Sequence, residues 1–233
     1  MPRISFFSRI IDMIAPRQCA ICGQRLTISE QAICGVCNMR LPRTDYFLSP
    51  HDNEVARLLW GQIPVEHCAS WFHYAPGSEV AHMIHNAKYY QHPELCETLG
   101  ELLATEVKDT GFFNGIDLLV PVPLTARRRR QRGYNQSECI ARGIGNTTHL
   151  PVESRAVKRL FFGGSQTGKD RFQRRENVEE AFSLVRPDLI AGRHLLVIDD
   201  ILTTGATVTS CARELLKAPD VKISVLTLGM TKS

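Results

Sequence analysis

Hydrophobic and polar positions follow two alternating periods along the second half of the chain. Short apolar runs over 116–122, 193–199 and 221–228 have the length and composition of buried strands. Between them, the segments 135–145 and 206–216 place apolar residues at helical spacing. Because strands that alternate with helices usually build one sheet, we predict an α/β fold with a mainly parallel sheet flanked by helices.

The first half of the chain predicts a small module followed by the start of the main domain. The elements expected there are a short helix, a strand and two longer helices, over 54–60, 65–74, 78–88 and 93–108. The segment 41–53 is rich in proline, serine, aspartate and asparagine, which is typical of turns. We therefore predict a boundary there, with an N-terminal module over residues 1–50 and a main domain over residues 51–233.

The N-terminal module begins with a stripe of apolar residues at helical spacing, which predicts an amphipathic helix. The stripe consists of Ile4, Phe7, Ile11 and Ile14. Its polar face is not especially basic, so we favour packing against the rest of the protein over attachment to a membrane. No apolar run approaches the roughly 18 residues of a membrane span, and no small-residue cleavage site precedes Pro16. We expect neither a membrane span nor a signal peptide, and a cytoplasmic location.

Composition changes this picture little, but the distribution of charge adds to it. The 233 residues are 43% hydrophobic and 22% charged, which excludes a disordered or fibrous chain. The net charge is only +4, yet basic residues gather in two clusters. These comprise Arg127, Arg128, Arg129, Arg130 and Arg132, and then Lys158, Arg159, Lys169, Arg171, Arg174 and Arg175. Such clusters predict local anion sites, for phosphate groups or a nucleic-acid backbone.

Four of the eight cysteines form two C-x-x-C pairs, Cys19 with Cys22 and Cys34 with Cys37, separated by eleven residues. Each pair puts two thiolates on one turn, and two facing turns make a tetrahedral sulfur site. Four cysteine ligands leave no open coordination position, so we predict a structural zinc ion in a zinc-ribbon module. Redox-active dithiols are the alternative interpretation. The remaining cysteines are scattered among apolar residues and are expected to be buried.

The sharpest pattern in the chain is an apolar run followed by two carboxylates. The run 195–198 predicts a strand that is buried on both faces, as parallel strands are. Asp199 and Asp200 come directly after it. They are therefore expected at the carboxyl end of a strand, where open α/β sheets bind their ligands.

A turn of small, hydroxyl-bearing residues follows the acids. A helix is expected to begin near Ala206, and its unpaired N–H groups and dipole favour an anion. Thr203, Thr204 and Thr207 add hydroxyl donors, and Gly205 lets the backbone approach a ligand closely. Acids beside an anion site suit a ligand that carries both a phosphate and neighbouring hydroxyl groups, namely a phosphorylated sugar.

All thirteen positions of 195–207 resemble the signature of the type I phosphoribosyltransferases for 5-phosphoribosyl-1-pyrophosphate. The resemblance implies the type I phosphoribosyltransferase fold, and Mg²⁺ bound with the substrate. It implies that Asp199 and Asp200 hold the ribose hydroxyls. It also implies that the 5-phosphate is wrapped by Thr203, Thr204, Gly205, Ala206 and Thr207.

Two other segments are similar to parts of the same enzymes. A Pro-Val-Pro strand end at 121–123 leads to an arginine-rich turn and to Arg-Gly-Tyr-Asn-Gln at 132–136. In the family the loop after this strand holds the pyrophosphate, which suits the guanidinium of Arg132. A later glycine-containing segment with Arg171 and Arg175 looks like the flexible loop that closes over the substrate. Its closure would exclude water from a cationic, sugar-like transition state.

Taken together and in this order, the cysteine module and these motifs resemble the ComF family (competence protein F) over nearly the whole chain. The resemblance implies a role in handling incoming single-stranded DNA during natural transformation, or in DNA utilisation. It also implies a DNA helicase partner in some bacteria. It does not define the reaction or the acceptor.

Three functions fit these residues. The first is phosphoribosyl transfer, in which a nitrogen base or ammonia attacks the anomeric carbon. The second is a non-catalytic module that binds single-stranded DNA through the basic clusters, with Tyr134 stacking on a base. The third is a sensor of phosphoribosyl pyrophosphate that carries out no chemistry. A homodimer is a further open alternative, since related folds often dimerise.

Overall fold

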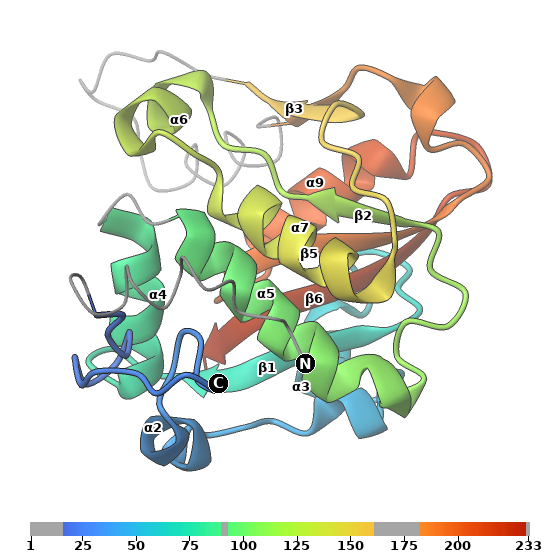
Figure 1. Cartoon of the computed structure of the whole chain (residues 1–233). Helices are drawn as coiled ribbons and strands as arrows, with labels where there is room; N and C mark the ends of the chain where they lie inside the picture. Colours follow the sequence, from blue (N-terminus) through green and yellow to red (C-terminus); the bar gives the residue numbers. More distant parts are fainter. Residues whose placement is uncertain (1–15, 90–92, 161–181, 232–233) are drawn as a thin grey trace, which may run out of the picture.

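The computed structural model describes residues 16–89, 93–160 and 182–231. Within these ranges the centre is a four-stranded sheet of order β1-β6-β5-β2, in which every neighbouring pair is parallel (Figure 1). Its strands are β1 (Cys68–Tyr74), β2 (Leu118–Pro121), β5 (His194–Leu202) and β6 (Lys222–Thr231). A separate antiparallel pair consists of β3 (Val157–Arg159) and β4 (Phe182–Leu184).

Helices cover both faces of the sheet, so the predicted fold class is confirmed. α5 (Pro93–Val107) and α7 (Gln136–Thr148) pack on one face, in front of the strands in Figure 1. α9 (Ala206–Leu215) lies on the other face. The other helices are α2 (Gly35–Arg40), α3 (Glu54–Leu59), α4 (Glu79–Tyr89) and α6 (Ala126–Arg132).

Alternate residues of the central strand belong to two different cores. On β5, Leu196 and Ile198 join the core formed with α4, α5 and α7, whereas Leu195 and Val197 join the core formed with α3 and α9. All four side chains are fully buried. A strand covered on both faces needs apolar residues at every position, which is why this run shows no alternation.

The predicted elements are present close to their expected bounds, and the short ones were missed. Periodicity gave no sign of α2, β3 or β4, because three to six residues are too few to show a period. The segment expected as an arginine-rich turn is instead the seven-residue helix α6. The predicted helix that carries Ile4 to Ile14 lies outside the described residues. Among the described helices, none combines the length and hydropathy that a bilayer-spanning segment requires.

Candidate functional site

The two carboxylates lie near the carboxyl end of β5, at the edge of the sheet where a ligand is expected. Asp199 and Asp200 are half-buried, and the strand continues past them to Leu202 rather than ending before them. The Oδ1 atom of Asp199 accepts the backbone N–H of Asp200 at 2.9 Å and the hydroxyl of Ser137 at 3.0 Å. Two donors on one oxygen fix the rotation of this carboxylate.

The turn after the strand has the geometry that the sequence predicted. Thr203 and Thr204 are exposed, and α9 begins at Ala206. Gly205 caps the helix at φ 76°, a left-handed conformation that favours glycine. A Cβ atom at this position would lie 3.2 Å from Cδ2 of Leu59, so the turn also packs closely on α3.

The structure therefore brings the acids and the turn over 203–207 together at the N-terminus of a ten-residue helix. Among the described residues, the contact that the N–H of Ala206 makes with the Thr204 hydroxyl is long, at 3.5 Å. Helix N-termini direct N–H groups and a partial positive charge at bound anions. Hydrogen-bond donors that suit an anion thus lie beside carboxylates that accept hydrogen bonds.

Arg132 reaches the same region from α6. It is the last residue of that helix, and its Nη1 donates to Oε1 of Gln136 at 3.0 Å. Gln136 is the first residue of α7, whose next residue, Ser137, contacts Asp199. Arg132, the residue predicted to bind pyrophosphate, is thus connected to the acid pair through the start of α7. The arginines at 127–130, in contrast, are all exposed on α6.

Tyr134 lies differently from what the base-stacking hypothesis requires. Its hydroxyl donates a hydrogen bond to the carbonyl of Ala87 in α4, and its ring packs against the core formed with α5 and α7. Burial raises the pKa of the Tyr134 hydroxyl. The side chain is therefore tied into the structure rather than lying open beside the arginines.

Two predicted substrate residues, Arg171 and Arg175, lie outside the described residues. The segment that carries them connects β3 to β4. Arg159, which the sequence placed in a basic cluster and at the start of the segment that resembles the flexible loop, is the last residue of β3, and its guanidinium lies 5.1 Å from the ring centre of Phe182. Burial lowers the pKa of Arg159, and the charge of Arg128 lowers it further, whereas Asp199 acts in the opposite sense. Arg159 is thus within electrostatic reach of both α6 and the acid pair.

Sequence reasoning missed Ser137 as a site residue. Its position directly after the Arg-Gly-Tyr-Asn-Gln motif was the available signal, but serine at a helix start is too common to single out. The contact with Asp199 joins positions 62 residues apart in sequence. This contact depends on how α7 packs against β5, which cannot be predicted from the sequence pattern of either segment.

The four predicted metal ligands form a second site. The sulfurs of Cys19, Cys22, Cys34 and Cys37 all lie within 4.8 Å of one another, and all but Cys22 are buried. Zinc–sulfur bonds of about 2.3 Å at tetrahedral angles place sulfurs about 3.8 Å apart. The distance between the sulfurs of Cys22 and Cys34 is 3.8 Å. The cluster therefore could hold a metal ion such as zinc.

Backbone N–H groups donate hydrogen bonds to two of these sulfurs, which favours the thiolate form that binds a metal cation. The N–H of Cys34 donates to the Cys19 sulfur at 3.3 Å, and the N–H of Cys37 donates to the Cys34 sulfur at 3.5 Å. Burial opposes ionisation of Cys19, but N–H groups of Cys22, Cys34 and Ile21 outweigh it and lower the pKa of this thiol to about 7. Burial raises the pKa of Cys37, as do the adjacent sulfurs. A cation among the four sulfurs would relieve this crowding of negative charge.

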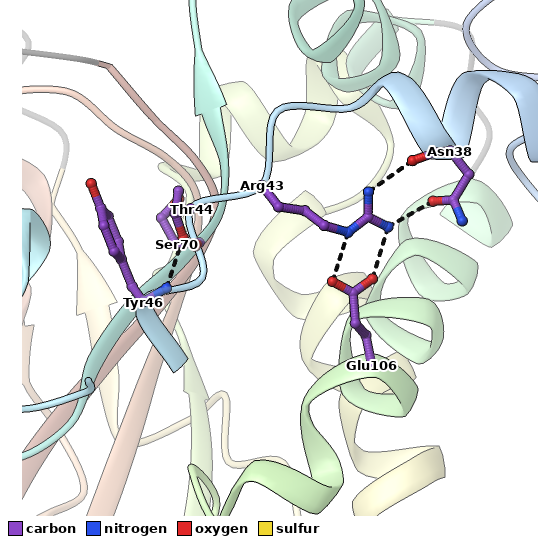
Figure 2. Close-up of polar contacts among 6 residues, drawn as sticks. All are labelled: Asn38, Arg43, Thr44, Tyr46, Ser70 and Glu106. Atoms are coloured by element: carbon purple, nitrogen blue, oxygen red, sulfur yellow. Dashed lines mark hydrogen bonds and ion pairs between the residues drawn. The ribbon is translucent and has the colours of Figure 1, made fainter. Parts of the chain in front are cut away.

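An ion pair joins the segment after the cysteine cluster to α5 (Figure 2). Arg43 donates from Nε and Nη2 to the two carboxylate oxygens of Glu106 in α5, at 2.8 and 2.9 Å. Its Nη1 and Nη2 also donate to the carbonyl and side-chain oxygens of Asn38 in α2, at 2.7 and 2.9 Å. One guanidinium thus holds α2, the helix that carries Cys37, against α5.

The chain is similar to curated proteins along most of its length. It is 31% identical over 230 residues to the DNA utilization protein YhgH of Escherichia coli K12, an alignment that covers 94% of this chain and 99% of that protein. It is 26% identical over 223 residues to competence protein F of Haemophilus influenzae, covering 89% and 94%. Competence protein ComFC of Bacillus subtilis is 30% identical over 112 residues, covering 48% and 43%. No protein-family model matches the chain.

Solved structures with partial similarity include phosphoribosyltransferases. An adenine phosphoribosyltransferase matches with a TM-score of 0.37 at 15% identity, covering 60% of this chain and 73% of that one. Glutamine phosphoribosylpyrophosphate amidotransferase from B. subtilis matches with a TM-score of 0.39 at 19% identity, covering 60% and 27%.

Proposed function

The chain belongs to the family of the DNA utilization protein YhgH and competence protein F, and from this premise we propose that it binds 5-phosphoribosyl-1-pyrophosphate with Mg²⁺ and acts in DNA uptake or utilisation. The observation that carries the binding proposal is the junction of β5 and α9. There the half-buried Asp199 and Asp200 lie beside a turn that ends at a left-handed glycine and a helix N-terminus.

Each side of this junction suits one part of the ligand. The N–H groups and hydroxyls over 203–207 would bind the 5-phosphate, because a helix N-terminus favours an anion. Asp199 and Asp200 would accept hydrogen bonds from the ribose hydroxyls, which are stronger when the acceptor is ionised. Arg132 would bind the pyrophosphate, together with Arg171 and Arg175 from the segment between β3 and β4. Bound Mg²⁺ would neutralise pyrophosphate charge and make it a better leaving group.

In a transferase reaction, the bond from the anomeric carbon to the pyrophosphate oxygen would break while a nucleophile forms a bond to that carbon. Arg132 would hold the departing pyrophosphate. The carboxylates near the ribose would stabilise positive charge that develops on the sugar. A nitrogen base or ammonia is the class of acceptor that this chemistry takes.

Replacement of Asp200 by asparagine tests the assignment. Asn keeps the size of the side chain but removes its charge, and a hydrogen bond to a charged group contributes about 1.5–3 kcal/mol. We expect the affinity for phosphoribosyl pyrophosphate with Mg²⁺ to fall at least about tenfold in calorimetric titration. Asp188→Asn is the matched control, because Asp188 is exposed and pairs with Arg186 away from this site. Equal affinities of the Asp200→Asn variant and the unaltered chain would refute the assignment.

The cysteines support two further proposals, one about the bound metal and one about the location of the protein. We propose zinc as the ion at the cysteine cluster and a structural role for it, because four sulfurs leave no position for a substrate. All eight cysteines are free of disulfides, which supports a reducing, cytoplasmic location.

The four exposed arginines at 127–130 favour a second candidate function, the binding of single-stranded DNA. A DNA helicase is the partner that such a role would involve. Binding through phosphate contacts should weaken steeply with salt, because bound counterions are released from the DNA. We expect the double variant Arg127→Glu/Arg130→Glu to lose affinity for an oligonucleotide in fluorescence anisotropy and to show a flatter salt dependence. Arg186→Glu, at an exposed residue outside α6, is the control. A salt-independent affinity would exclude this function.

A further inference from the structure

Three consecutive residues at the start of α7 each contact a different part of the candidate site. Nδ2 of Asn135 donates to the carbonyl of Val122 at 3.0 Å, just beyond the end of β2. Oε1 of Gln136 accepts from Arg132 at 3.0 Å. The hydroxyl of Ser137 donates to Asp199 at 3.0 Å. One turn of helix therefore joins β2, α6 and β5.

The side chains that make these contacts are almost completely buried. Asn135, Gln136 and Ser137 are 6%, 2% and 4% exposed. Buried polar groups that lose their partner are costly, so buried hydrogen bonds hold their geometry more firmly than exposed ones. The contacts thus restrict how α7, Arg132 and Asp199 lie relative to one another.

Asn135 does not make the capping hydrogen bond that is usual for an asparagine at a helix N-terminus. It is the N-cap residue of α7, where the side-chain oxygen normally accepts an N–H from the first turn. No such capping bond forms, and Oδ1 of Asn135 has no hydrogen-bond partner among the described residues. The side chain serves the contact with Val122 instead. The side chain of Asn135 therefore links α7 to the residue after β2 and does not stabilise the N-terminus of α7 by capping.

Ser137 acts on the atom of Asp199 that already accepts from Asp200. Both hydrogen bonds reach Oδ1, at 3.0 and 2.9 Å. The backbone N–H of Asp200 fixes the carboxylate relative to its own strand, whereas Ser137 fixes it relative to α7. Without the hydroxyl, the carboxylate would lose this contact with α7 and keep the one with the backbone of its own strand.

We propose that Ser137 is a positioning residue for Asp199, and Gln136 a positioning residue for Arg132, so that the first turn of α7 sets the distance between the ribose and pyrophosphate parts of the site. The proposal rests on the proposed function, since it assigns a role to these contacts in binding phosphoribosyl pyrophosphate. It adds two residues that act through the proposed binding groups, Arg132 and Asp199.

The test is a double-mutant cycle read by calorimetric titration with phosphoribosyl pyrophosphate and Mg²⁺. Ser137→Ala is expected to weaken binding about threefold to tenfold, the worth of one buried hydrogen bond. In the Asp199→Ala background the same change is expected to have little further effect, because the acceptor of the Ser137 hydroxyl is already absent. Gln136→Ala and Arg132→Ala form the second cycle, with the same expectation. Ser137→Thr keeps the hydroxyl and should recover most of the affinity.

Thr148→Ala is the matched control for Ser137→Ala. It also removes a hydroxyl from α7, but one at the other end of the helix, which donates to the carbonyl of Ile144 at 2.8 Å and accepts the N–H of Leu150 at 3.3 Å. It should leave binding unchanged. An unchanged affinity of Ser137→Ala, or losses that simply add in the double variants, would overturn the positioning role while leaving the proposed function intact. Absence of binding by the unaltered chain would instead overturn the proposed function, and the positioning role with it.

Discussion

Alanine at position 143 is expected to force α5 and α7 apart and to destabilise the whole domain. A Cβ atom on Gly143 would lie 1.9 Å from the carbonyl oxygen of Glu97 and 2.9 Å from the backbone nitrogen of Glu101. On the facing helix, a Cβ on Gly100 would lie 2.2 Å from the carbonyl oxygen of Ile140. Because these obstacles are backbone atoms, no side-chain rotation relieves them, and the helices must separate.

Two opposing contributions to the free energy of unfolding decide whether Gly143→Ala stabilises or destabilises the protein. Alanine favours a helix over glycine by about 1 kcal/mol, which alone would stabilise the variant. Overpacking of a core costs about 1–3 kcal/mol, and more where the backbone has to move. We expect Gly143→Ala to lose about 2 kcal/mol or more of the free energy of unfolding in urea.

Gly35→Ala provides the control, since a Cβ at this helical glycine would meet only Oε1 of Glu30, at 3.6 Å. It should be neutral or slightly stabilising. Equal unfolding midpoints for Gly143→Ala and the unaltered chain would show that the two helices are farther apart than described. Because α7 also carries Ser137, the variant should bind phosphoribosyl pyrophosphate more weakly wherever it remains folded.

Removal of the metal from the cysteine cluster is the second change for which we expect a large effect. Structural zinc contributes about 10–16 kcal/mol of binding free energy in isolated zinc modules, and that energy is available only in the folded state. Cys19, Cys34 and Cys37 are buried in the same core as Trp71 and Phe72 of β1. We therefore expect Cys34→Ser, or a strong chelator, to release about one zinc ion per chain and to expose the module to proteolysis.

Mass spectrometry of the metal content and limited proteolysis measure this directly. The cleavage sites should fall before Arg43, which pairs with Glu106, because the core that the sheet forms with α3 and α9 contains none of the four clustered cysteines. Cys96→Ala is the control: Cys96 is equally buried but stands apart from the four clustered sulfurs. A chain that is purified without metal and resists proteolysis as well as the metal-bound form would contradict the structural role.

Local patterns were sufficient for the candidate site where it is continuous in sequence. The run that became β5, the two acids and the helix start at Ala206 could be predicted because a buried strand and a helix each leave a period over several residues. The exact end of the strand could not, because pairing with β6 extends β5 to Leu202. The order of the strands was equally open, since β1 pairs with β6 near the far end of the chain.

The sequence by itself determined the alternation of strands and helices, the cysteine spacing and the acid–turn–helix motif, because each depends on residues that are close along the chain. Only the tertiary structure decided that Ser137 contacts Asp199, that Arg43 joins α2 to α5, and that Gly100 and Gly143 let two helices touch. These contacts join residues about 40 or more positions apart. Their partners are selected by how whole elements pack, and packing depends on shape complementarity that no periodicity in one segment can encode.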